Sequence, residues 1–106
     1  MSHELIVFVT VPSREVSSQI AQSLVSERLA ACVNVVPGVE SIYRWDGEVT
    51  SDSELLLIIK TTDERYVAVE RRVKELHPYA TPEVIGFRIS RGSEEYLKWL
   101  RESTTP

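Results

Sequence analysis

The sequence predicts an α+β domain with the element order β-α-β-β-α-β, followed by a short third helix. Three observations lead to this prediction. Residues 30–61 have the pattern of one long β-hairpin, a strand pattern and a helical stripe lie on each side of it, and the 106 residues suffice for one domain spanning 1–106. With right-handed crossovers, this order places both long helices on one face of a four-stranded antiparallel sheet.

The first part of the chain supplies a strand and a helix. Residues 3–11 are apolar and β-branched with little alternation, which predicts a strand buried on both faces. Ser13 is a favourable N-cap and Glu15 falls in the first turn, so a helix is expected up to about Arg28. The apolar stripe of this helix consists of Val16, Ile20 and Leu24.

The long hairpin turns at Asp46-Gly47, a dipeptide that favours two-residue turns because both positions need positive φ. Fully extended, its first arm (30–45) would span about 50 Å. A compact chain of this length has a diameter of only roughly 30 to 35 Å. Pro37-Gly38 predicts a bend, since proline cannot donate to the ladder and glycine tolerates a kink. The outer half, residues 39–54, is therefore expected to project.

A projecting hairpin leaves backbone edges and the apolar side chains of Ile42, Tyr43 and Trp45 in water. Burial against another copy of the chain removes this liability. We therefore predict a homo-oligomer in which Tyr43 and Trp45 are interface anchors, because buried aromatic side chains dominate interface energetics.

The second part of the chain repeats the strand and helix. Residues 55–59 are aliphatic and predict a central strand, and the N-cap of the next helix is either Thr61, in a capping box with Glu64, or Asp63 alone. Pro78 ends this helix because the preceding His77 is biased away from helical backbone. Its apolar stripe consists of Tyr66, Val69, Val73 and Leu76.

A last strand and a short helix complete the expected fold. Residues 84–89 predict the strand, Ser93 caps the helix, and residues 103–106 are expected to fray. The side chains of the helix that are expected to point inward are Tyr96, Leu97 and Leu100. One face of the sheet stays open, so its cover must come from the third helix, from neighbouring subunits or from a ligand.

Composition excludes several classes of function. A net charge of −4 argues against a general nucleic-acid surface, and residues 55–61 lack the aromatic side chains of an RNA-binding sheet. No apolar run approaches the ~18 residues that span a bilayer, and the N-terminus has no signal-peptide pattern. Cys32 is the single cysteine, which fits a reducing compartment. We expect a cytoplasmic chain without nucleic-acid or membrane partners.

Catalysis has little support in the sequence. There is no GxSxG elbow and no phosphate-binding glycine loop, and two histidines leave little for a catalytic triad. The sequence does not predict an enzyme.

Five stretches that cover nearly the whole chain resemble one known family. They are residues 27–36 (ERLAACVNVV), 39–49 (VESIYRWDGEV), 54–61 (ELLLIIKT), 77–84 (HPYATPEV) and 96–100 (YLKWL). On these stretches the chain resembles the CutA divalent-cation tolerance proteins. The resemblance implies a ferredoxin-like fold similar to PII signalling proteins, a homotrimer held through the hairpin, and binding of copper(II) or another divalent cation.

The resemblance also implies metal ligands. His77 matches the histidine of the family's HPY motif and Cys32 the cysteine of its AAC motif, whereas Val9 and Leu76 stand where some members carry a further cysteine and histidine. The alternative is structural: a histidine at a helix C-terminus complements the dipole, and a free cysteine packs as a small apolar side chain. The sequence leaves open whether His77 and Cys32 converge.

Two further groups of residues are candidate binding sites. The even-numbered carboxylates Asp46, Glu48, Asp52 and Glu54 either share a face that binds a hard cation or form a solvated face. Tyr79 and Glu83 either line a ligand cleft at a subunit junction or make structural contacts. The alternative function is therefore a PII-like small-molecule sensor, or a scaffold protein.

Overall fold

The computed structural model describes residues 3–106 and contains one antiparallel sheet with the strand order β2-β3-β1-β4. The elements in chain order are β1 (Glu4–Val11), α1 (Arg14–Ser26), β2 (Cys32–Trp45), β3 (Glu48–Thr62), α2 (Asp63–Leu76), β4 (Ile85–Arg88) and α3 (Glu94–Ser103). This arrangement confirms the predicted α+β class, the β-α-β-β-α-β order and the short third helix.

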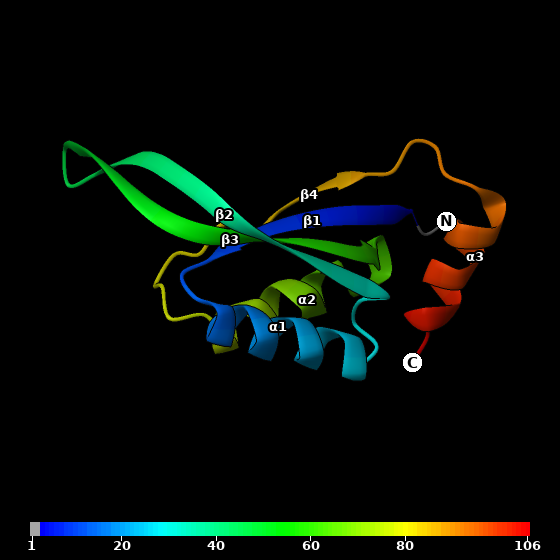
Figure 1. The fold of residues 1–106 in the computed structure, drawn as a ribbon. Coiled ribbons are helices and arrows are strands. Elements are labelled where there is room, and N and C mark those ends of the chain that lie inside the picture. Colours follow the sequence, from blue (N-terminus) through cyan, green and yellow to red (C-terminus); the bar gives the residue numbers. More distant parts are fainter. Residues whose placement is uncertain (1–2) are drawn as a thin grey trace.

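Helices α1 and α2 lie side by side on one face of the sheet, and α3 lies at the end farthest from the hairpin tip (Figure 1). The core is the layer between the sheet and the two long helices. It contains alternate residues of β1 and β3 together with the helical stripes, namely Leu5, Val7, Val9, Val11, Ile20, Leu24, Leu57, Ile59, Val69 and Val73.

Strand β1 is buried on one face only, so the prediction of burial on both faces is wrong. Its residues alternate between buried and partly buried along the whole strand. The physical reason is that α1 and α2 cover a single face. We call the other side the open face. The strand pairing places six apolar residues on this face: Ile6, Phe8, Leu56, Ile58, Ile85 and Phe87.

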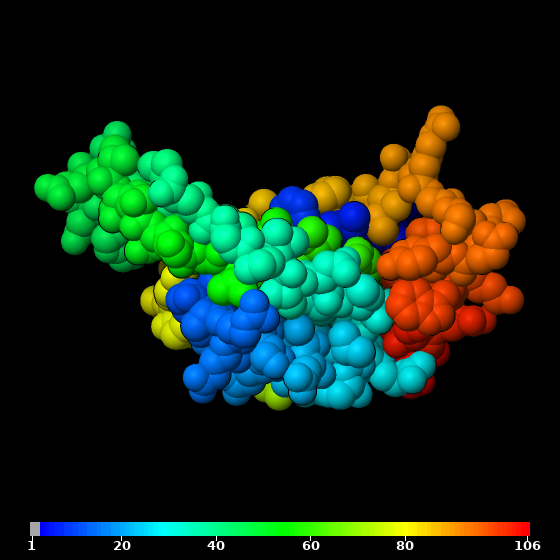
Figure 2. Space-filling view, in the orientation of Figure 1, coloured from blue at the N-terminus to red at the C-terminus, as the bar shows by residue number. Residues whose placement is uncertain are grey.

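The hairpin projects from the body of the molecule as predicted (Figures 1 and 2). Trp45 pairs with Glu48 across the tip, and Asp46 and Gly47 adopt φ values of 52° and 78°. The ladder register shifts between Val36 and Val39, where Gly38 has a φ of 78°. The bend at Pro37-Gly38 is therefore confirmed, and it directs the outer ladder away from the helices.

Helix α2 begins at Asp63 with Thr62 as its N-cap, and Thr62 makes no capping hydrogen bond through its side chain. Neither predicted cap was correct, because both residues have other partners. The Thr61 hydroxyl donates to the Leu29 carbonyl at 2.6 Å, and the Asp63 carboxylate pairs with Arg88 at 3.6 Å. The helix ends at Leu76 with His77 in extended backbone, as the following proline predicted.

The C-terminal segment is anchored, so the expectation of fraying was wrong. Arg28 donates to the carbonyl oxygens of Glu102 and Thr105 at 2.9 and 2.7 Å, and Arg65 donates to that of Thr104 at 2.8 Å. These contacts join distant parts of the chain, which local sequence patterns do not reveal.

Helix α3 begins after Ser93, whose hydroxyl accepts from the Tyr96 amide at 3.2 Å as predicted. Leu100 is fully buried, but Tyr96 is exposed rather than inward. Its ring lies against that of Trp99, with centroids 5.4 Å apart.

Candidate ligand groove beneath the hairpin

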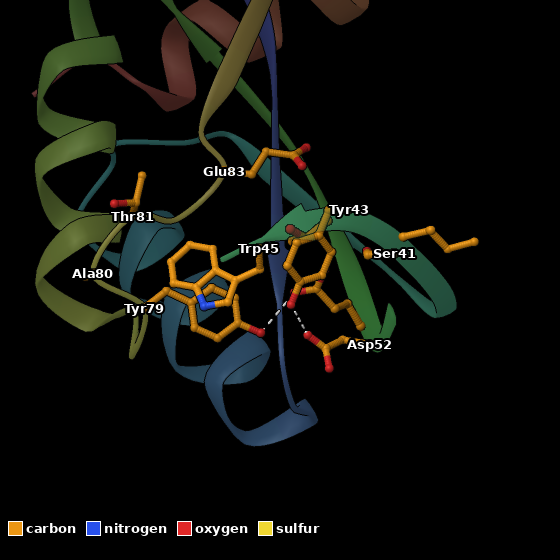
Figure 3. A pocket seen from close by; sticks show the side chains of 11 residues that line it. Ser41, Tyr43, Trp45, Asp52, Tyr79, Ala80, Thr81 and Glu83 are labelled. Carbon is orange, nitrogen blue, oxygen red and sulfur yellow. Dashed lines mark hydrogen bonds between the residues drawn. The ribbon is translucent and has the colours of Figure 1, made fainter. Parts of the chain in front are cut away.

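A groove of about 630 Å³ lies between the projecting hairpin and the loop that joins α2 to β4. Figure 3 shows the side chains that line it. One wall carries Tyr43, Trp45 and Asp52 from the hairpin, and the other carries Tyr79 and Glu83 from the loop. The bend at Pro37-Gly38 positions the first wall, and the end of α2 at Leu76 positions the second.

Two tyrosine hydroxyls donate hydrogen bonds to the groove carboxylates of β3. Tyr79 donates to Glu54 Oε2 at 3.1 Å, and Tyr43 donates to Asp52 Oδ2. Asp52 and Glu54 lie two residues apart on β3 and therefore share one side of the ladder. Each carboxylate thus has one oxygen fixed by a phenol.

The surroundings raise the pKa of both phenols above the ordinary value of 10.0. Burial, followed by the hydrogen bond to Glu54, raises the pKa of Tyr79 to about 12. The hydrogen bond to Asp52 is the main cause that raises the pKa of Tyr43. Both side chains therefore serve as hydrogen-bond donors in the groove.

His77 links the loop wall of the groove to strand β1. Its Nδ1 accepts from the Tyr79 amide at 3.1 Å, and its Nε2 lies 2.8 Å from the Thr10 carbonyl oxygen. A neutral imidazole that accepts at Nδ1 carries its proton on Nε2, so Nε2 is the donor to Thr10. The centroids of the His77 and Tyr79 rings lie 4.6 Å apart, and His77 is only 7% exposed. Both ring nitrogens are engaged, which leaves neither free for a metal ion.

The structure does not bring Cys32 and His77 together within one chain. Cys32 pairs with Lys60 of β3, whereas Thr10, the partner of His77, lies opposite Leu56. These positions are separated by roughly 13 Å along the strand. The Cys32 sulfur instead lies 3.9 Å from the Lys60 ammonium.

Among the described residues of a single chain, no complete metal site is found. Within residues 3–106, no group of three or more His, Cys, Asp and Glu side chains is arranged to hold a metal ion. Of the four even-numbered carboxylates, Asp52 and Glu54 line the groove, whereas Asp46 and Glu48 lie at the hairpin tip. The described residues of one chain therefore do not fit a bound divalent cation.

Sequence reasoning paired Tyr79 with Glu83 but did not connect them to the hairpin. Both predicted anchors, Tyr43 and Trp45, line the same groove, and Trp45 is 67% exposed.

In the region that the structure describes, no helix has the length and apolar character needed to cross a membrane.

Comparisons with known proteins agree in both sequence and fold. A model of the CutA1 divalent ion tolerance protein family matches residues 5–103. The divalent-cation tolerance protein CutA of Thermus thermophilus is 57% identical over 101 residues, covering 95% of this chain and 98% of that protein. The chloroplastic CutA protein of Arabidopsis thaliana is 52% identical over 100 residues, covering 94% of this chain. The chain spans 55% of the length of that relative.

Solved structures superpose closely. The Thermus thermophilus divalent cation tolerance protein has a TM-score of 0.95 at 57% identity, covering 96% of this chain and 99% of that one. A protein of Archaeoglobus fulgidus described as a periplasmic divalent cation tolerance protein has a TM-score of 0.93 at 35% identity, covering 96% and 99%. The chain belongs to the CutA1 family of divalent ion tolerance proteins.

Proposed function

We propose that the chain acts in divalent-cation tolerance as a cytoplasmic homotrimer that binds copper or another divalent metal at junctions between its copies. The proposed role is binding and assembly rather than catalysis. The observation that carries it is the amount of apolar surface that one chain leaves in water.

This surface has two parts. On the hairpin, Ile42 and Trp45 are each 67% exposed. On the open face, Ile85 and Phe87 are 54% and 47% exposed. Apolar surface of this extent marks an interaction site. The resemblance to the CutA family supports three as the number of copies.

The metal is proposed at a junction because the part of the chain that the structure describes holds no group of three or more potential ligands. Cys32 shares its side of the sheet with Lys60 and Ile6, so it lies on the open face, which the copies would cover. The exposed carboxylate of Glu83 lines the groove beneath the hairpin. Assembly would add ligands from a second copy to either place.

Light scattering coupled to size-exclusion chromatography tests the assembly. Wild type is expected at three times the chain mass of 12.1 kDa. Ile42→Asp should yield a smaller species, because a charge at an interface core opposes association. Val67→Asp is the matched control, since Val67 is 65% exposed but lies on α2. A monomeric wild type would refute the proposal.

Calorimetry with copper(II) tests the metal role. Wild type should release heat on binding, Cys32→Ser should bind less, and the dissociated Ile42→Asp variant should lose the binding. Equal heats for the assembled and dissociated proteins would show that the site does not depend on a junction. Negligible heats for wild type would remove the metal role altogether.

A second candidate is a sensor that binds a small molecule in the groove. The volume of about 630 Å³ falls within the range of ligand pockets, which is about 300 to 1,000 Å³. Thermal-shift screening against organic acids, amines and nucleotides tests this function. A panel without a single shift would count against it.

A further inference from the structure

We infer that the groove binds an organic cation, an ammonium group carried on an aliphatic stem. The inference rests on the second proposed function, a small-molecule site in the groove, and names the chemistry of its ligand. It follows from the charge, the hydrogen bonding and the aromatic side chains of the groove.

The groove carries negative charge without a basic counterpart. Three carboxylates line it, those of Asp52, Glu54 and Glu83, and its lining includes no lysine or arginine. The ion pairs found among residues 3–106 join other side chains and leave these three carboxylates out. A cation would therefore supply the missing opposite charge, whereas an anion would be repelled.

Glu54 is the strongest single indication. The residue is only 7% exposed, and a buried carboxylate normally requires a cation or several donors. Among the described residues its one hydrogen bond comes from Tyr79, which is a neutral donor and reaches Oε2 only. Glu54 lines the groove, and no donor among the described residues reaches its Oε1, so an ammonium N–H would complete the arrangement.

The aromatic side chains fit the same ligand. Trp45 on the hairpin and Tyr79 on the loop both line the groove, and the hydroxyls of Tyr43 and Tyr79 are directed toward the same point (Figure 3). Indole and phenol rings attract ammonium groups through their π faces. The carboxylates of the groove thus provide the counter-charge, and its aromatic rings provide the apolar walls that an alkylammonium stem requires.

A bare metal ion fits this groove less well. No group of three or more potential ligands has metal-binding geometry within residues 3–106. Tyr43 and Tyr79 each hold one carboxylate oxygen, which reduces the number available to a metal. The volume also exceeds what a single ion fills.

Titration with 1,4-diaminobutane, followed by two-dimensional NMR, tests the inference. The matched probes 1,4-butanediol and succinate have the same number of carbons but are neutral and anionic. The diamine should shift the Trp45 indole and Tyr79 amide signals, with Trp99 on α3 as an internal reference. Its affinity should fall as salt is added. Equal shifts with butanediol, or shifts with succinate alone, would overturn the inference.

Glu83→Gln should weaken diamine binding about tenfold, because it removes one exposed charge from the groove. Glu40→Gln is the matched control. Glu40 is an exposed carboxylate on the same hairpin, but it pairs with Ser53 and is not part of the groove lining. Equal affinities for the two variants would contradict the proposed role of the groove carboxylates.

The outcomes separate this inference from the proposed functions. All lining residues described here belong to one chain, so the diamine titration reports on the groove itself, whereas light scattering reports on assembly. A thermal-shift response to another compound class, with no diamine binding, would overturn the inference and leave a sensor function standing.

Discussion

At the scale of single residues, Tyr79 connects the hairpin to the loop after α2. The environment raises its pKa from the ordinary value of 10.0 to about 12. Below pH 10 both the folded and the unfolded chain hold this proton. As the pH rises from 10 toward 12, the unfolded chain loses the proton while the folded chain keeps it. Deprotonation then favours the unfolded state, so the stability that this group contributes is lost through that window.

We therefore predict that the urea midpoint of wild type falls between pH 9 and about pH 11.5, and that it falls less in Tyr79→Phe. Other tyrosines also titrate in this range, which makes the difference between the two proteins the informative quantity. An equal decrease in both would contradict the role assigned to the Tyr79 hydroxyl.

His77 is predicted to stabilise the fold without any metal. His77→Ala removes the hydrogen bonds to Thr10 and Tyr79 and leaves a buried space. The free energy of unfolding should fall by about 2 kcal/mol, the typical cost of an unpaired buried partner. Urea unfolding in the presence of a chelator measures this loss. His3→Ala, the change at the exposed second histidine, is the control and should leave stability unchanged.

At the scale of elements, the turn at the hairpin tip should control only the outer ladder. Gly47 has a φ of 78°, which costs a residue with a side chain about 1 kcal/mol. Gly47→Ala should lower hydrogen-exchange protection from Tyr43 to Thr50 and leave protection near Ile59 unchanged. Asp46→Asn is the control, because asparagine also suits this turn. A uniform loss of protection would show that the tip is coupled to the core.

The sequence predicted those elements whose signals are local. Asp46-Gly47 has the backbone preference of a hairpin turn, Pro78 ends α2, and Ser13 and Ser93 cap helices with their own hydroxyls. The start of α2 was missed because the Thr61 hydroxyl bonds to Leu29, far away in the chain. Long-range partners of this kind leave no periodic pattern in a sequence.

The candidate site was predictable only in part for the same reason. Tyr79, Glu83, Tyr43 and Trp45 stood out as chemically suitable residues. Their meeting in one groove depends on the direction in which Pro37-Gly38 bends the hairpin, and a sequence indicates that a bend exists but not where it leads. The separation of Cys32 from His77 likewise follows from strand register.

At the scale of the whole molecule, the shape itself argues for association. The radius of gyration is 14.3 Å, whereas a compact chain of this length has about 13 Å. The principal extents of 44 × 25 × 22 Å show that the excess lies along one axis. The projecting hairpin accounts for it (Figure 2). One chain thus exposes the projecting hairpin and the apolar open face of the sheet. Both surfaces are suited to contact with another copy of the chain.

If copies cover these surfaces, stability must depend on protein concentration, because association favours the folded chain by mass action. We predict that the thermal midpoint of wild type rises by several degrees between about 5 and about 500 μM, as scanning calorimetry can measure. Ile42→Asp should abolish this dependence, because it opposes association through the hairpin. Val67→Asp, at an exposed position of α2, should retain it. A midpoint independent of concentration in wild type would mean that the single chain is stable with its arm in water.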